Sequence, residues 1–301
     1  MKLPNFLIIG VQKAGTTSIY NYLKQHPQVY MSPVKETNFL EKDWEQLLKD
    51  GRRTSQANKI DTFEKYCNLF KGVKDEIAIG EDSPNYLFHH DTSIELIKRY
   101  VPHAKLIAVL RNPIERAHSD YLMHVRDAIG EKNKTLLEQI QYSAHKSFVL
   151  RKGFYGAHLQ HFYDNFNQEQ IQVYLYDDLC KDAVKFMQEM YQFIEVDDTF
   201  VPDVSKKAQT AAVPKNQFVN KLLRKKNPLR VAVGSTLKLF IPEEKRQKIR
   251  SNLIRLNSGD KSNASLSSEE RQALVNLYRD DILHLQKLID RDLSAWLKVR
   301  S

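Results

Sequence analysis

Short apolar runs, separated by stretches with helical periodicity, dominate the hydrophobic pattern of this chain. The first run is uninterrupted and rich in β-branched residues, which is typical of a strand buried on both faces of a parallel sheet. The runs predicted as strands are Phe6–Ile9, Val29–Met31, Ile77–Ile79, Ala104–Leu110 and Ile171–Tyr176. Because helical patterns lie between them, we expect an α/β fold with three α/β/α layers around a central parallel sheet of about five strands.

The predicted helices have recognisable starts. Asn112 can cap a helix, and Pro113 suits the first helical position. Near the C-terminus, Ser267 and Glu270 have the spacing of a capping box, and an apolar stripe continues from there toward Trp296. We therefore expect a C-terminal helical segment whose apolar stripe packs into the core.

The chain has 301 residues, of which 42% are hydrophobic and 28% charged, as in ordinary globular proteins. We predict a single domain over 1–301, with a core over about 1–200 and a basic flap with C-terminal helices over about 201–301. The net charge of +9 favours an anionic ligand or polymer without choosing between them. Cys67 and Cys180 lie far apart and lack zinc-ligand spacing, which fits a reducing compartment.

A glycine-containing loop follows the first predicted strand. Gly10 and Gly15 flank it, and the hydroxyl residues 16–18 lead into a predicted helix. N–H groups at a helix N-terminus bind phosphate or sulfate, so this order predicts an anion cradle. The ATP/GTP P-loop, G-x-x-x-x-G-K-S/T, has the same glycine spacing, but here Thr16 stands where that lysine would be. The lysine of this loop is Lys13, placed over a group held at the mouth of the loop.

Two segments resemble the nucleotide-binding segments of a known enzyme family. Q-K-A-G-T-T-S-I at 12–19 and L-I-A-V-L-R-N-P-I-E-R-A-H-S-D-Y at 106–121 resemble those of the sulfotransferases that use 3′-phosphoadenosine 5′-phosphosulfate (PAPS), closest to the heparan-sulfate and bacterial branch. The resemblance implies a P-loop-like fold and transfer of a sulfuryl group from PAPS to a hydroxyl or amine, releasing PAP. The implied acceptor is a small natural product or a carbohydrate.

The resemblance also implies roles for individual residues. Lys13 would neutralise the charge that grows on the leaving phosphate. Arg111 and Ser119 would bind the 3′-phosphate of the donor. Arginine suits this role because its planar guanidinium can donate two hydrogen bonds to one phosphate. The alternative for Arg111 alone is an ion-paired residue at a strand end, and Arg116, on the same helical face as Ser119, can be structural. The residues implied to bind the donor around its 5′-phosphate are Lys13, Ala14, Gly15, Thr16, Thr17 and Ser18.

Glu36, in K-E-T-N-F-L after the second strand, matches the glutamate that is the catalytic base in the heparan-sulfate branch. Partial desolvation can raise the pKa of a glutamate toward working pH. The alternative is a surface glutamate paired with Lys35. Relatives often have E-K-S/T-P after the third strand, with a lysine that approaches the sulfuryl group, but here Asp82 replaces it. Either Lys13 acts alone or a lysine of the basic segment assists, and Asp82 could instead face a cationic acceptor.

Several further residues are candidates. Lys215, in the basic segment 205–230, is predicted to contact the donor if that segment is a flap rather than a solvated face. Tyr155, in G-F-Y-G, is predicted to pack near the nucleotide, with a core position as the alternative. His158 and His161 lack the spacing and the further ligand of a metal site, so no metal is expected.

Two other classes of function stay open at this point. A P-loop kinase or NTPase would use Asp177 and Asp178, after the last predicted strand, to bind magnesium. A non-catalytic basic module would bind polyanions in a salt-dependent way, although no segment resembles a nucleic-acid-binding motif. No apolar run approaches the roughly 20 residues of a membrane span, and 1–4 leaves no room for a signal peptide. We therefore expect a cytoplasmic enzyme without nucleic-acid or membrane partners.

Overall fold

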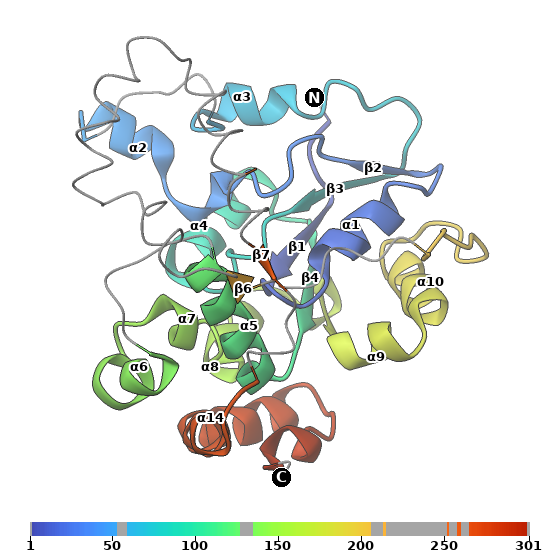
Figure 1. Ribbon diagram of the computed structural model, residues 1–301. Coiled ribbons are helices and arrows are strands. Elements are labelled where there is room, and N and C mark those ends of the chain that lie inside the picture. The colour runs from blue at the N-terminus through green and yellow to red at the C-terminus, as the bar shows by residue number, and fades with distance from the viewer. Residues whose placement is uncertain are drawn as a thin grey trace. The chain divides into compact units, whose positions relative to one another are not determined.

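Figure 1 shows the chain in a computed structural model, which describes residues 2–52, 59–126, 135–205, 213–214, 252, 258–259 and 265–299. Lys215 and most of the basic segment 205–230 lie outside the described residues. The chain divides into two compact units. The first unit comprises 1–116, 152–208 and 278–297, and the second comprises 117–151, 209–277 and 298–301. The single-domain organisation stays a prediction.

A five-stranded sheet forms the centre of the first unit. Its strand order is β2-β3-β1-β4-β5, and every neighbouring pair is parallel. The strands are β1 (Phe6–Gly10), β2 (Val29–Met31), β3 (Ala78–Asp82), β4 (Lys105–Leu110) and β5 (Ile171–Leu175). β1 is buried at every position because it lies in the middle of the sheet between β3 and β4. The predicted α/β class and parallel sheet are confirmed.

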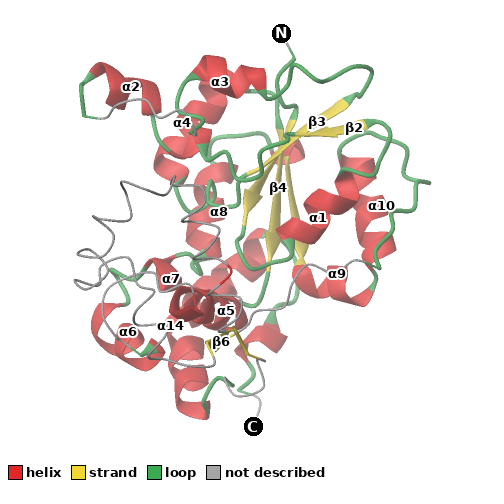
Figure 2. Ribbon diagram, turned by 45° about the horizontal axis from the view of Figure 1, so that its top comes forward, coloured by secondary structure: helices red, strands yellow, loops and turns green. Residues whose placement is uncertain are grey.

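Helices cover both faces of this sheet, which gives the predicted three layers (Figures 1 and 2). α1, α9 and α10 lie on one face, and α4 and α8 lie on the other. The helices of the first unit are α1 (Thr16–Leu23), α2 (Trp44–Lys49), α3 (Phe63–Asn68), α4 (His90–Tyr100), α8 (Tyr155–Tyr163), α9 (Tyr176–Lys181) and α10 (Ala183–Phe193), with the 3-10 helices η1 (Phe39–Glu41), η2 (Gln168–Gln170) and η4 (Ser294–Leu297).

The described part of the second unit is mainly helical. It contains α6 (Leu136–Ser143), α7 (Phe148–Arg151) and a short antiparallel pair, β6 (Val213–Pro214) with β7 (Ser258–Gly259). Two helices, α5 (Pro113–Arg126) and α14 (Ser268–Leu288), have residues in both units. The predicted capping box before α14 is confirmed, because the Ser267 N–H donates to the Glu270 carboxylate and the Glu270 N–H donates to Ser267 Oγ.

At two of the strand ends that differ from the prediction, the difference concerns carboxylates. β3 extends to Asp82 rather than ending at Ile79, and the side chains of Glu81 and Asp82 are fully buried. Hydrophobic pattern alone ends the strand earlier because carboxylates are rarely buried without partners. β5 ends at Leu175, one residue before the predicted end, so Asp177 and Asp178 lie in the first turn of α9.

Candidate active site

The glycine-containing loop connects the carboxyl end of β1 to the start of α1, where ligands bind in open parallel sheets. Lys13 and Gly15 both have left-handed backbone conformations, with φ of 73° and 82°. A Cβ at Gly15 would lie 2.9 Å from side-chain atoms of both Leu179 and Tyr176 in α9. The loop is therefore shaped by a conformation and a close approach that only glycine accommodates at this position.

The start of α1 has the form of an anion cradle. Gly15 is the N-cap and has no side chain to cap the helix, while its carbonyl oxygen accepts hydrogen bonds from Ser18 and Ile19 N–H. N–H groups of the first turn point out of the helix end, where the helix dipole favours an anion. The Ala14 and Thr16 side chains are buried, whereas Thr17 is exposed and Lys13 is half-buried.

Arg111, at the carboxyl end of β4, contacts this loop directly. Its Nη1 donates a hydrogen bond of 3.1 Å to the carbonyl oxygen of Lys13, and its guanidinium lies 5.1 Å from the ring centroid of Tyr176. The structure thus brings together the two motifs that the sequence placed far apart. Ser119 is buried on α5, in the second unit, so its predicted pairing with Arg111 stays a prediction.

Glu36 lies in the loop that follows β2. Its backbone has a φ of 56°, an uncommon conformation for a residue other than glycine, and its N–H donates to the Asp82 carbonyl oxygen at 2.8 Å. The Glu36 carboxylate is 3.2 Å from the Lys35 ammonium, with 38% of its side chain exposed. The pairing with Lys35 is therefore present, and the role of Glu36 as a base stays a prediction.

Glu81 anchors this loop to the sheet. Its buried carboxylate accepts hydrogen bonds from Thr37 Oγ1 at 2.6 Å, from the Tyr66 and Tyr86 hydroxyls at 2.8 Å each, and from Ser83 Oγ. Burial raises the pKa of both tyrosines well above the usual value, with the Glu81 charge acting in the same direction. Four hydroxyl donors satisfy a carboxylate that would otherwise be costly to bury.

Asp82 has a partner within the chain. Its Oδ2 lies 3.0 Å from the Lys35 ammonium, and its side chain is fully buried. The cation beside Asp82 in this structure is Lys35, and contact of Asp82 with a cationic acceptor stays a prediction. Lys35 is a residue of interest that the sequence suggested only as a surface partner of Glu36.

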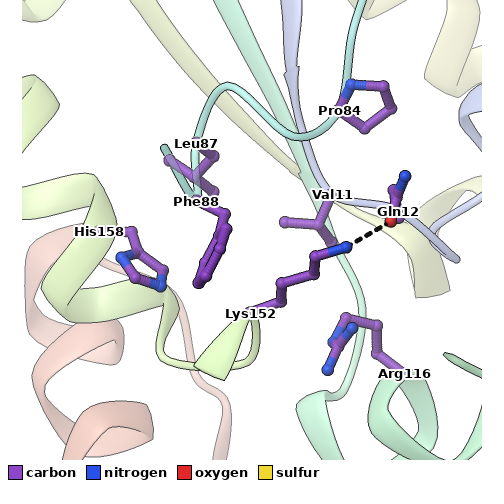
Figure 3. A pocket seen from close by; sticks show the side chains of 8 residues that line it. All are labelled: Val11, Gln12, Pro84, Leu87, Phe88, Arg116, Lys152 and His158. Carbon is purple, nitrogen blue, oxygen red and sulfur yellow. Dashed lines mark hydrogen bonds between the residues drawn. The ribbon is translucent and has the colours of Figure 1, made fainter. Parts of the chain in front are cut away.

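A small pocket opens beside the loop (Figure 3). Lys152 reaches across it and donates to Gln12 Oε1 at 2.8 Å, and the ring of Phe88 meets His158 edge to face, with centroids 5.5 Å apart. The residues that line the pocket are Val11, Gln12, Pro84, Leu87, Phe88, Arg116, Lys152 and His158. Sequence reasoning missed Lys152 and Phe88, although Lys152 directly precedes the G-F-Y-G segment.

The remaining candidates are placed as follows. Tyr155 is fully buried at the start of α8, and burial raises its pKa, although the nearby Arg116 charge opposes the rise. Among the described residues, the Tyr155 hydroxyl has no hydrogen-bond partner. The Asp281 carboxylate of α14 caps α8, accepting from the Gly156 and Ala157 N–H groups at 2.9 Å each.

The residues considered for metal binding have other contacts. His161 stacks on His90 with centroids 4.1 Å apart. Asp177 accepts a hydrogen bond from the Trp296 indole at 3.3 Å, and Asp178 pairs with Arg291 at 2.9 Å. Within the described ranges no group of three His, Cys, Asp or Glu side chains could hold a metal ion. Both aspartates considered for magnesium are thus in contact with residues of the C-terminal segment, Trp296 and Arg291.

Comparison with known protein families distinguishes between the classes of function that the sequence left open. The model of the sulfotransferase family matches residues 4–200 of this chain, which include the loop, Glu36, Asp82 and Arg111. The chain belongs to the sulfotransferase family. This membership confirms the resemblance to the sulfotransferases.

Individual relatives agree with the family. The chain is 29% identical over 144 residues to the membrane-associated sulfotransferase kil1 of Dictyostelium discoideum, covering 48% of this chain and 28% of that protein. It is 28% identical over 207 residues to the bifunctional heparan sulfate N-deacetylase/N-sulfotransferase 1 of Caenorhabditis briggsae, covering 64% of this chain and 23% of that protein. The chain thus spans less than a third of the length of either relative.

A solved bacterial structure shares this fold. The sulfotransferase from Alicyclobacillus acidocaldarius is 25% identical, with a TM-score of 0.70 covering 99% of this chain and all of that one. The P-loop-like sulfotransferase fold is thereby confirmed. In the part of the chain that the structure describes, every helix is too short or too polar to cross a bilayer.

Proposed function

We propose that this protein transfers a sulfuryl group from PAPS to a hydroxyl or amine of an acceptor and releases PAP. The observation that carries the proposal is the hydrogen bond between Arg111 and the Lys13 carbonyl. It places a guanidinium beside a loop that opens onto a helix N-terminus, at the carboxyl ends of parallel strands. Two phosphate-binding devices in contact fit a donor with phosphates at two positions.

Binding of the donor is assigned to the loop and its neighbours. The 5′-phosphate would be held by residues 13–18 through the first-turn N–H groups and the hydroxyls, and the 3′-phosphate by Arg111 with Ser119. Lys13 would neutralise charge on the leaving phosphate. Lys152 supplies a second ammonium on this side of the loop, since it already contacts Gln12. Donor contacts by Tyr155 and Lys215 stay predictions.

Glu36 is proposed as the base. As the acceptor oxygen or nitrogen bonds to sulfur, the bond between sulfur and the phosphate oxygen breaks, and the acceptor proton passes to Glu36. The Glu36 side chain is 38% exposed, so an acceptor can approach it, while its backbone is held against β3. A base fixed in this way needs no reorganisation at the moment of transfer.

The acceptor is proposed to be a carbohydrate or a small natural product. The name of one relative specifies heparan sulfate, which supports a carbohydrate. Beside the loop, Phe88 and Leu87 offer apolar contacts and Lys152 and His158 offer polar ones, which suits an acceptor that carries both kinds of group. The cytoplasmic location stays a prediction, to be tested by cell fractionation.

Calorimetric titration tests the donor assignment. PAP and, separately, Mg-ATP are titrated into the purified protein, followed by a sulfation assay with PAPS and a panel of saccharides and phenols. We expect PAP to bind in the micromolar range or tighter and Mg-ATP to give no heat. Binding of Mg-ATP without PAP would overturn the proposal, because the loop would then serve a nucleoside triphosphate.

A further inference from the structure

Three charged groups form a row at the proposed base. The Lys35 ammonium lies 3.2 Å from Glu36 Oε1 and 3.0 Å from Asp82 Oδ2. Exposure of the side chains falls along the row, from 38% for Glu36 through 21% for Lys35 to 0% for Asp82. A single cation therefore interacts with an accessible carboxylate on one side and with a buried carboxylate on the other.

The backbone fixes this arrangement. Glu36 N–H donates to the Asp82 carbonyl oxygen at 2.8 Å, and Asn38 N–H donates to Ser83 Oγ at 3.1 Å. Glu36 and Asn38 both have left-handed backbone conformations, with φ of 56° and 51°. Such conformations cost free energy in residues other than glycine and persist where the surroundings hold them. The loop therefore keeps the two carboxylates at fixed positions around Lys35.

The charge on Asp82 is sensitive to pH. The ionisable groups that face it are Lys35 and Glu36 from the loop after β2, Glu81 from β3 and Tyr20 from α1. Burial raises the pKa of Asp82 to about 7, although the Lys35 cation opposes the rise. The carboxylates in turn raise the pKa of Lys35, which stays charged. The charge of the Asp82 carboxyl can therefore change near neutral pH.

We propose that Asp82, acting through Lys35, is a positioning residue that sets the proton affinity of Glu36. The inference rests on the proposed function, in which Glu36 is the base. With Asp82 ionised, Lys35 is shared between two carboxylates, and Glu36 keeps a higher proton affinity. With Asp82 protonated, Lys35 interacts with Glu36 alone and makes it a weaker base. Turnover then rises as Asp82 ionises, in addition to the rise that Glu36 itself causes.

The test is the pH dependence of kcat between pH 5 and 9 for the wild type and Asp82→Asn, with PAP affinity measured in parallel. We expect a step near pH 7 in the wild type that is absent from D82N, and a loss of roughly tenfold in kcat at pH 8, because a weaker base is a slower one. PAP affinity and the KM for PAPS should stay within about twofold of the wild type, since the change acts on proton transfer.

The matched control is Asp61→Asn. Asp61 is also a buried carboxylate paired with a lysine, at 2.7 Å from Lys65, but it lies just before α3 rather than at the end of β3. D61N should keep the step near pH 7. A D82N enzyme with a uniformly lowered kcat and an unchanged pH profile would overturn the inference, because Asp82 would then act on structure alone.

Two further variants separate this inference from the proposed function. Glu36→Gln that stays fully active would overturn Glu36 as the base, whereas an inactive E36Q with a wild-type-like D82N profile would overturn only the role of Asp82. If D82N does not fold, Lys35→Met provides the test. Without the cation both carboxylates hold protons more tightly, so the rise of kcat should move to higher pH, and an unmoved rise would contradict the inference.

Discussion

The guanidinium of Arg111 donates a hydrogen bond to the carbonyl oxygen of Lys13, so the end of β4 and the loop after β1 form one unit of structure. Among the described residues this hydrogen bond is made by Nη1, so the other nitrogens of the guanidinium can donate to a ligand. The same residue thus orders the loop and takes part in the proposed recognition of the donor.

Replacing Arg111 by lysine should weaken PAP binding by about tenfold or more, because an ammonium cannot contact the loop carbonyl and a phosphate with the geometry of a planar fork. Titration calorimetry with PAP measures the change. Arg99→Lys, at an exposed arginine paired with Asp43 at 2.9 Å, is the control and should bind PAP as the wild type does. Equal affinities for R111K and wild type would exclude Arg111 from the donor site.

Replacing Lys13 by alanine should lower kcat by roughly 100- to 1,000-fold, as expected for loss of a charge at a leaving group. The melting temperature should change little, because the loop backbone is held by Gly15 and Arg111. Steady-state kinetics with PAPS and differential scanning fluorimetry provide the two readouts. A K13A enzyme with near-normal kcat would mean that another cation neutralises the leaving phosphate.

Lys152→Met should lower kcat by about tenfold, because one of the two ammonium groups on this side of the loop is lost while the aliphatic stem is kept. The matched control is Lys98→Met, since Lys98 also donates to a side-chain amide, Asn165 Oδ1, at 2.7 Å, but lies on the exposed side of α4. If both variants lose activity equally, Lys152 has no special role at the loop.

Gly15→Ala should destabilise the fold by about 1–3 kcal/mol and abolish measurable PAP binding, because the left-handed conformation and the 2.9 Å approach to Leu179 both reject a Cβ. Urea unfolding and calorimetry measure the two effects. Gly51 also has a positive φ, but a Cβ added there would meet no atom within 4 Å. Gly51→Ala should therefore lose only the stability that the unfavourable backbone conformation costs, and it should keep its PAP affinity. A G15A protein that binds PAP normally would contradict the proposed cradle.

Local pattern was sufficient to predict the sheet. Strands such as β2 and β4 were recognised to within one residue at each end because apolar runs between helical stretches have few other interpretations. The starts of α5 and α14 followed from capping residues, and Ile114 N–H indeed donates to the Asn112 side chain at 2.9 Å. Hydrogen bonds between residues that are only a few positions apart can be predicted from the order of residues in the sequence.

Contacts between distant residues were not predictable in this way. Lys152 and Gln12 are 140 residues apart, and Thr37 and Glu81 are 44 residues apart, so no periodicity links them. Nothing in the sequence predicts the left-handed backbone conformation of Glu36 either, because glycine is the residue that usually adopts this conformation. Burial of Glu81 and Asp82 depends on partners that only the folded sheet brings together, which is why the predicted β3 was too short.

The cap that Asp281 provides to α8 has a consequence for biosynthesis. The carboxylate and the Gly156 N–H it accepts from are 125 residues apart, so α8 emerges from the ribosome long before its cap does. The first turn of α8 leads to the pocket residue His158, and the N–H groups of this turn gain their Asp281 partner only when α14 has been made. A nascent chain arrested before α14 should therefore carry a phosphate loop but an unfinished pocket, so competence for an acceptor would wait until α14 has been translated.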